Sequence, residues 1–319
     1  VSLVADGTVI DSKPMRIVMD PKVEERFSGA QRVAYDKLVN DLHTSQQRGQ
    51  TVATRLTALA SQIAFHGGDP EKDLVEVQPR AGEHTLRPED IVAKINELGD
   101  ELALVCFGGV NFYTGQAFDM AAITTAAHAV GANAGFDLAH AAGNLHLKLH
   151  DWNMDFACWC SYKYLNSGPG SVAGVFVHQR HLGKELPLFP GWWGHDKSER
   201  FKMERTFKPM PTAEAWQVSN APVFSMAVHR VALEQFDRAG IANLRAKSEL
   251  LTAYLQFVLE IAAKQTGAQL EIITPKDPAQ RGCQLSVLAH GKGRGLFDAL
   301  TARGVIADWR EPNVIRMAP

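Results

Sequence analysis

Cysteine is scarce in this 319-residue chain, as are long apolar runs and any excess of charge of one sign. The four cysteines are Cys106, Cys158, Cys160 and Cys283, and they include one Cys-x-Cys pair without a second pair. A structural zinc site needs about four ligands, so this spacing argues against one. We predict that the cysteines are reduced core thiols of a cytoplasmic protein.

Charge and hydropathy exclude several classes of function. The chain carries 33 basic and 35 acidic residues, a net charge of −2, so no electrostatic footprint for nucleic acid or an anionic membrane is present. No run of about 18 apolar residues occurs, so the sequence predicts no transmembrane helix. Residues 1–10 are too short and too polar for the core of a signal peptide. The composition, 45% hydrophobic and 21% charged, is typical of a globular protein.

Apolar runs alternate with helical patterns through the middle of the chain. The predicted strands are 102–107, 132–138, 156–160 and 172–177, and the predicted helices are 86–98 and 120–130. This alternation predicts an α/β fold with a mainly parallel sheet and helices on both faces. Continuous apolar runs such as 102–107 are expected in strands that are covered on both faces.

The last part of the chain has a different pattern. A long helical region, 225–265, is broken near Gly240, and short strands with one helix follow it. The predicted strands there are 269–274, 283–289, 305–309 and 314–317, with a helix at 296–303. We therefore predict a large domain at 1–222 and a smaller α+β domain at 223–319. Residues 1–60, with helical patterns at 35–42 and 52–63, are the least informative.

Four polar residues follow the predicted strands of the large domain at their carboxyl ends. Asp137 and His140 lie at the end of the predicted strand 132–138, and Tyr162 and Lys163 lie just beyond the next, 156–160. In open α/β sheets, ligands bind beyond the carboxyl ends of the strands, so these residues are candidates for one site. Lysine suits Schiff-base chemistry, because its pKa shifts readily when it is desolvated.

This combination points to pyridoxal phosphate. The lysine amine can hold the aldehyde of that cofactor as a Schiff base, and an aspartate can keep its pyridine nitrogen protonated. Arg316, on a predicted C-terminal strand, is suited to bind a substrate carboxylate. Each residue also has a structural alternative: an exposed loop lysine, a helix N-cap for Asp137, a satisfied loop histidine for His140 and a surface charge for Arg316.

Several motifs together resemble the kynureninase family of pyridoxal-phosphate enzymes. The resemblance runs from about Ser61 to Pro319. The motifs are Asp137-Leu-Ala-His140, Cys158-Trp-Cys-Ser-Tyr-Lys-Tyr-Leu-Asn166, Gly191-Trp-Trp-Gly-His195, Arg200-Phe-Lys-Met203, Ser219-Asn220 and Ile315-Arg-Met-Ala-Pro319. The resemblance implies the fold of aspartate aminotransferase, known as fold type I.

The resemblance also implies roles for individual residues. Lys163 would carry the cofactor as a Schiff base, Asp137 would pair with its pyridine nitrogen, and His140 and Tyr162 would contact it. Trp192 and Asn220 would complete the cofactor site, partly across a homodimer interface. Arg316 would hold the substrate α-carboxylate. Lys163 and Tyr162 are the expected catalytic residues, with Tyr162 as proton donor. No metal is implied.

The implied reaction is the hydrolysis of L-kynurenine or 3-hydroxy-L-kynurenine to L-alanine and anthranilate or 3-hydroxyanthranilate. This step belongs to tryptophan catabolism and supplies a precursor of NAD. The adjacent Trp192 and Trp193 favour an aromatic substrate, because flat rings stack on such side chains.

The amino-terminal part departs from the family pattern. Residues 1–60 contain neither the family's threonine-containing phosphate-binding turn nor its Phe-Pro-Ser/Thr-Asp loop. One alternative is therefore a truncated, non-catalytic family member that acts as a structural or partner-binding protein. Another is a different enzyme of the same fold, such as a cysteine desulfurase or an aminotransferase. A desulfurase needs a catalytic cysteine on a mobile loop, whereas the cysteines here lie in or at the start of predicted strands.

Overall fold

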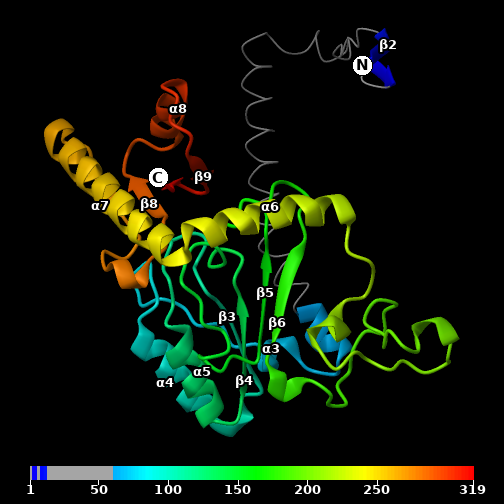
Figure 1. Cartoon of the computed structure of the whole chain (residues 1–319). Coiled ribbons are helices and arrows are strands. Elements are labelled where there is room, and N and C mark those ends of the chain that lie inside the picture. Colours follow the sequence, from blue (N-terminus) through cyan, green and yellow to red (C-terminus); the bar gives the residue numbers. More distant parts are fainter. Residues whose placement is uncertain (1, 6–7, 13–59) are drawn as a thin grey trace, which may run out of the picture. The chain divides into compact units, whose positions relative to one another are not determined.

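The computed structural model describes residues 2–5, 8–12 and 60–319, which divide into two compact units, Val1–Glu76 and Val77–Pro319 (Figure 1). In the first unit, β1 (Ser2–Ala5) and β2 (Thr8–Ser12) form an antiparallel pair, and α3 (Pro70–Asp73) is a short helix. The helical pattern predicted at 35–42 and the part of 52–63 before residue 60 lie outside the described residues, and residues 60–63 are helical as predicted.

The larger unit contains the predicted α/β sheet. Its strands are β3 (Leu104–Gly108), β4 (Asn133–Asp137), β5 (Phe156–Cys160) and β6 (Ala173–Val177), hydrogen-bonded in that order. β3, β4 and β5 run parallel, and β6 is antiparallel to β5. The predicted α/β class with a mainly parallel sheet is confirmed.

Two amphipathic helices cover one face of this sheet. α4 (Pro88–Leu98) begins with a proline and two acidic residues, as suits a first turn, and α5 (Met120–Ala129) begins after Asp119, which caps the amide of Ala122. The cluster that they form with the sheet contains Ile91, Ile95, Met120, Ile123, Ala127, Val105, Phe136 and Ala157. Each large apolar side chain buried there stabilises the fold by roughly 1.5–3 kcal/mol.

The opposite face of the sheet is open in the part of the chain that the structure describes. Leu104 is 44% exposed and Val175 is 47% exposed, and Cys106 and Cys158 are exposed as well. The expectation of core thiols is therefore wrong for these two cysteines, and the expectation of a strand covered on both faces is wrong for residues 102–107. A continuous apolar run does not reveal which face of a strand another element covers.

The carboxyl-terminal part of this unit is a second, antiparallel sheet beside two long helices (Figure 1). The long helices are α6 (Val223–Ala239) and α7 (Ile241–Thr266), and α8 (Arg294–Ala302) is a shorter one. The strands are β7 (Leu270–Ile272), β8 (Leu285–Ala289), β9 (Asp308–Arg310) and β10 (Val314–Met317). The strand order is β7-β8-β10-β9. The break between the long helices at Gly240 (φ 76°) falls where the sequence predicts it.

Short 3-10 helices occupy several connections of this unit. They are Gly99–Glu101, Gln179–His181, Arg200–Lys202, Ala213–Trp216 and Pro278–Gln280. Both sheets belong to the unit Val77–Pro319, and the domain boundary between residues 222 and 223 stays a prediction. Within the described ranges, no helix is both long enough and apolar enough to cross a bilayer.

Candidate active site

The segments that follow β3, β4 and β5 meet at the carboxyl edge of the parallel strands. The amide of Gly109 donates to the Asp137 carbonyl (2.8 Å), and the amide of Leu138 donates to the Cys158 carbonyl (2.8 Å). A Cβ atom at Gly109 would lie 2.8 Å from the Cβ of Ala141, so only glycine permits this close approach. The strand ends therefore form one continuous surface, as the sequence predicts.

The turn that bears Lys163 is fixed by hydrogen bonds on both sides. The amide of Asn166 donates to the Lys163 carbonyl (3.0 Å), and the amide of Ser167 donates to the Ser161 carbonyl (3.1 Å). The hydroxyl of Ser167 also lies 2.7 Å from Nδ1 of His229, which connects the turn to α6. Lys163 is half-buried, and its Nζ lies 5.9 Å from the ring centroid of the exposed Tyr162. The exposed-loop alternative for Lys163 does not describe this position.

Asp137 ends β4 with its carboxylate exposed at the same edge. Its Oδ1 accepts a hydrogen bond from the amide of Ala139 (2.8 Å). Residues 139–143 form turns, and no α-helix begins after Asp137 in this described stretch, so Asp137 is not an α-helix N-cap. The carboxylate is left accessible to a ligand.

His140 lies between two aromatic rings and has a buried nitrogen without a partner. Its ring centroid is 5.8 Å from that of Tyr164 and 6.3 Å from that of Phe112. Its Nδ1 has no hydrogen-bond partner among the described residues, so the alternative of a satisfied loop histidine is wrong. An unsatisfied buried polar atom is costly and is uncommon away from functional sites.

The electrostatics of His140 bring the predicted residues together. Burial, together with the positive charges of Lys163 and Arg316, lowers the pKa of His140 to about 4, and the negative charge of Asp137 opposes them in part. The lysine, the arginine and the aspartate are therefore near enough to one imidazole to influence its pKa. The imidazole is neutral at pH 7.

Arg316 is held in place from two directions. Its Nε donates to Oδ2 of Asp308 (2.8 Å), its Nη2 also bonds to that oxygen, and its Nη1 donates to the Phe112 carbonyl (2.6 Å). The side chain is only 12% exposed, so Arg316 is not a surface charge. The strand β10 thus places a guanidinium against the loop that follows β3.

That loop connects the two sheets of the unit. The carbonyls of three successive residues, Phe112, Tyr113 and Thr114, accept hydrogen bonds from the carboxyl-terminal sheet. The donors are Arg316 Nη1 to Phe112, Ser286 Oγ to Tyr113 (2.6 Å) and Thr274 Oγ1 to Thr114 (2.5 Å). The arginine is therefore positioned by a sheet that is itself attached to the site.

Trp192 and Asn220 lie in the irregular segment before α6. Trp192 is partly exposed and packs edge-on against Phe201, with ring centroids 5.3 Å apart. Asn220 is exposed. Among the described hydrogen bonds and ring contacts, none joins these two residues to Asp137, His140 or Lys163. Their roles in a cofactor site remain predictions.

A second polar cluster lies at the opposite, amino-terminal end of β5. Asp155 is 3% exposed, and its carboxylate accepts hydrogen bonds from the Ala134 amide (2.7 Å) and Arg180 Nε (2.9 Å). It also lies 2.8 Å from His128 Nε2 and 2.7 Å from His181 Nε2. Burial alone would raise the pKa of Asp155, but the hydrogen bonds and the Arg180 charge lower it to about 2. The cluster fastens α5 and the segment after β6 to the sheet.

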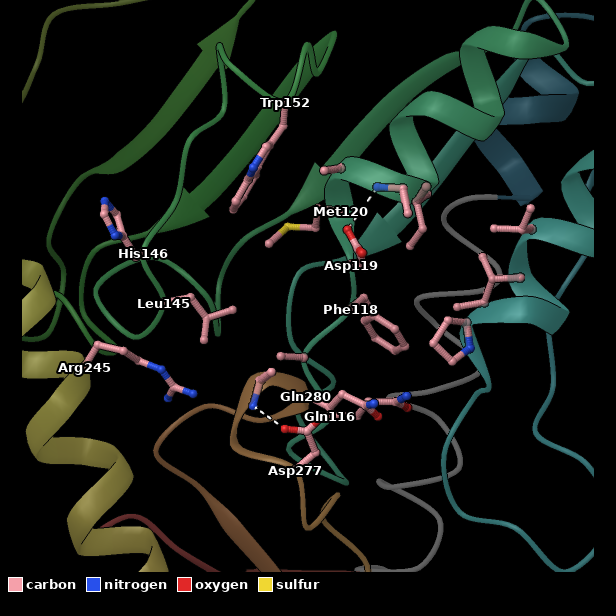
Figure 2. A pocket seen from close by; sticks show the side chains of 18 of the residues that line it. Gln116, Phe118, Asp119, Met120, Leu145, His146, Trp152, Arg245, Asp277 and Gln280 are labelled. Carbon is pink, nitrogen blue, oxygen red and sulfur yellow. Dashed lines mark hydrogen bonds between the residues drawn. The ribbon is translucent and has the colours of Figure 1, made fainter.

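A cavity of about 540 Å³ opens among α4, α5 and the start of α7 (Figure 2). Its walls are mainly apolar, with Phe118, Met120 and Trp152 facing it, and Arg245 and Asp277 lie at its rim. None of the predicted site residues lines it.

Comparison with known proteins places the chain in a family. Residues 244–319 match the family described as the kynureninase C-terminal domain. A kynureninase from Koribacter versatilis is 50% identical over 288 residues, which cover 90% of this chain and 67% of that protein. The chain belongs to the kynureninase family. A kynureninase from Flavobacterium psychrophilum is 57% identical over 260 residues, 81% of this kynureninase-family chain. The chain spans 61% of the length of that relative.

Solved structures support the fold of this kynureninase-family chain. The apo cysteine desulfurase of Thermococcus onnurineus NA1 has a TM-score of 0.59 at 15% identity and covers 76% of this chain and 60% of its own. An alanine–glyoxylate aminotransferase from Nostoc sp. has a TM-score of 0.55 at 18% identity, covering 82% and 66%. The predicted fold type I class is confirmed, and at these identities the likeness concerns the fold alone.

Sequence reasoning missed two parts of the site. Asp308, the partner of Arg316, was not singled out, although the predicted strands at 305–309 and 314–317 imply a hairpin that sets the two side chains across from each other. The Phe112 carbonyl is a backbone group, which every residue has, so the sequence does not show that it binds Arg316. Asp155 was missed as well, because its partners are far from one another along the chain.

Proposed function

We propose that this kynureninase-family chain is part of a pyridoxal-phosphate-dependent hydrolase that cleaves a carbon–carbon bond of L-kynurenine or 3-hydroxy-L-kynurenine. The products are L-alanine and anthranilate or 3-hydroxyanthranilate. One observation carries the proposal: at the carboxyl edge of the sheet, the half-buried Lys163 and the exposed Asp137 accompany His140, whose buried Nδ1 has no hydrogen-bond partner among the described residues. The 57% identity to a kynureninase over most of this chain supports the same reaction.

The residues at this edge fit pyridoxal phosphate. A half-buried lysine, an exposed carboxylate and a buried nitrogen without a partner are the groups that such a ring and its aldehyde engage. When bound, the cofactor supplies an electron sink for the negative charge that develops on the substrate Cα. Lys163 would hold its aldehyde, Asp137 its pyridine nitrogen, and His140 and Tyr162 would contact it.

The chain's own residues supply binding and proton transfer. Arg316 binds the α-carboxylate and fixes the amino acid over the edge of the sheet. The amine of Lys163 would take the proton from the substrate Cα. Tyr162 would return a proton to the alanine unit, and the 5.9 Å between its ring centroid and Lys163 Nζ supports this role. His140 is neutral at pH 7, so it lies against a ligand without adding positive charge.

The proposal includes a homodimer located in the cytoplasm, in which Trp192 and Asn220 complete the cofactor site. Exposed apolar side chains support a protein interface on the long helices of the described unit. Phe224 of α6 is 90% exposed, and Leu250 and Tyr254 of α7 are 74% and 66% exposed. Large exposed apolar patches of this kind mark interaction surfaces.

The first experiment adds pyridoxal phosphate to the purified chain and records the visible spectrum. Covalent attachment of the cofactor to Lys163 produces a band at about 420 nm, as for lysine-bound cofactor generally. The band is expected in the wild type and in Lys148→Ala, which changes an exposed lysine, and it is expected to be absent in Lys163→Ala. A wild-type chain without the band would favour the non-catalytic alternative.

The second experiment measures products. Hydrolysis of L-kynurenine by the chain with cofactor should release equal amounts of alanine and anthranilate, and Tyr162→Phe should slow it. A variant that keeps full turnover would remove Tyr162 from the mechanism. A chain that binds the cofactor without cleaving kynurenine would point to another reaction of this fold.

A further inference from the structure

Asp308 has no assigned role, although it is the closest charged neighbour of Arg316. The two residues are Cα partners in the antiparallel pairing of β9 and β10, so their side chains project from the same face of the sheet. Oδ2 of Asp308 accepts from both Nε and Nη2 of Arg316. This is the side of the guanidinium nearest the arginine's own aliphatic stem.

The donors of Arg316 can be counted. A guanidinium has five N–H groups in a fixed plane. Asp308 uses one on Nε and one on Nη2, and the Phe112 carbonyl uses one on Nη1. One N–H on each terminal nitrogen is left. This pair matches the two oxygens of a carboxylate, which arginine binds in bidentate fashion.

We propose that Asp308 is a positioning residue, which orients Arg316 so that its two terminal nitrogens face the α-carboxylate of the substrate. This inference rests on the proposed function, because it takes an amino acid as the ligand. A free arginine side chain has several rotatable bonds, and fixing it before binding lowers the entropy cost of binding. The carboxylate of Asp308 and the Phe112 carbonyl hold the guanidinium from two sides.

Arg310 also lies against Asp308, and it supports the assignment. Its Nε donates to the same Oδ2 (3.0 Å), so Asp308 faces two arginines and not one. The side chain of Arg316 is 12% exposed, and that of Arg310 is 45% exposed. The buried arginine thus has its position fixed by Asp308, whereas the exposed one retains contact with water.

The test compares ligands that differ only in the α-carboxylate. L-kynurenine and kynurenamine, the amine that lacks this carboxylate, are titrated against the chain loaded with cofactor, and kcat and KM are measured for kynurenine. In Asp308→Asn, KM for kynurenine is expected to rise about 10-fold, since charge-assisted hydrogen bonds of this kind are lost. The affinity for kynurenamine and kcat should change less than about 2-fold. Asp308→Glu should restore part of the loss.

The matched control is Asp298→Asn, because Asp298 of α8 also pairs with an arginine, but at an exposed position. Its Oδ1 lies 3.6 Å from Nε of Arg294. This variant should leave both affinities unchanged. Equal weakening of both ligands by Asp308→Asn would show a merely structural role and overturn the proposal. No weakening of kynurenine binding would overturn it as well.

A second readout does not depend on the proposed function. The Nε–H of Arg316 is expected to give a slowly exchanging NMR signal in the wild type, which exchanges at least 10-fold faster in Asp308→Asn. Unchanged exchange would show that Asp308 does not hold the arginine. If the chain binds no kynurenine at all, the proposed function fails, and this measurement still decides whether Asp308 positions Arg316.

Discussion

Asp155 and Asp137, at opposite ends of the parallel strands, differ in burial and in the number of hydrogen bonds that they accept. Asp155, before β5, is 3% exposed and is surrounded by a backbone amide, a guanidinium and two imidazoles. Asp137, at the end of β4, is exposed and accepts a hydrogen bond from the amide of Ala139. One carboxylate is enclosed by the protein, and the other faces outward.

The difference separates a carboxylate that the protein satisfies from one that is proposed to bind a ligand. A buried carboxylate is tolerated when its neighbours satisfy it, and the low pKa of Asp155, about 2, reflects such neighbours. At the other end, the neighbours of Asp137 include a buried imidazole nitrogen that the described protein does not satisfy. Unsatisfied groups beside an accessible carboxylate are those that a ligand completes.

The largest expected effect is on stability at the amino-terminal end. Asp155→Asn should lower the free energy of unfolding by about 3 kcal/mol, because it removes a buried carboxylate that pairs with Arg180, His128 and His181. Asp137→Asn, the matched change at the exposed end, should cost less than about 0.5 kcal/mol. Urea denaturation of both variants at pH 7 measures the difference, and equal losses would contradict the contrast.

The next largest effect is on turnover, which we expect to depend more on Asp137 than on Asp155. Asp137→Asn should reduce kynurenine turnover at least 100-fold, about 2.7 kcal/mol of transition-state stabilisation, because the proposed pyridine partner is lost. Steady-state kinetics with saturating cofactor measure it, with Asp155→Asn at a temperature well below its unfolding midpoint as the comparison. A larger kinetic loss in the Asp155 variant would count against the proposed site.

Acid should weaken the enclosed carboxylate's contribution. The pKa of Asp155 is about 2 in the folded protein and ordinarily 3.8, so its stabilisation is present above about pH 4 and is lost as the pH falls toward 2. The stability difference between the wild type and Asp155→Asn should shrink by about 2 kcal/mol over this interval. If the difference in unfolding free energy between the two proteins did not change between pH 4 and pH 2, the charge of Asp155 would not be its cause.

The smallest effect concerns a single imidazole. NMR titration should find the pKa of His140 at about 4, because burial and the charges of Lys163 and Arg316 disfavour its protonated form. Lys163→Met should raise that pKa by less than about one unit, since burial is the larger cause. The control Lys148→Met should leave it unchanged. A midpoint near 6.5 in the wild type would show that His140 is not enclosed among these groups.

Much of the fold could be predicted from sequence periodicity. The strands at 156–160 and 314–317 and the helix break at Gly240 are found where the patterns place them. Periodicity could not show that the sheet face with Cys106 and Cys158 is open, because burial depends on which other elements pack there. The residues of a strand do not show which of its faces another element covers.

The site was predictable to the extent that it follows strand ends. Asp137 ends β4 and Lys163 lies just beyond the end of the neighbouring parallel strand β5, so topology alone brings them to one edge. Asp308 and the Phe112 carbonyl depend on how the second sheet meets the first, which short-range patterns do not encode. Asp155 shows the same limit, because His128 and His181 reach it from positions 27 and 26 residues away.

The bond between Arg316 and the Phe112 carbonyl has a consequence for how the chain folds. It joins residues 204 positions apart, and contacts of such long range form slowly. β10 lies between β8 and β9, so the second sheet cannot close until Val314–Met317 have left the ribosome. A growing chain can hold its lysine and its aspartate in place long before the arginine arrives. Among Asp137, Lys163 and Arg316, the arginine is therefore the last to reach its folded position.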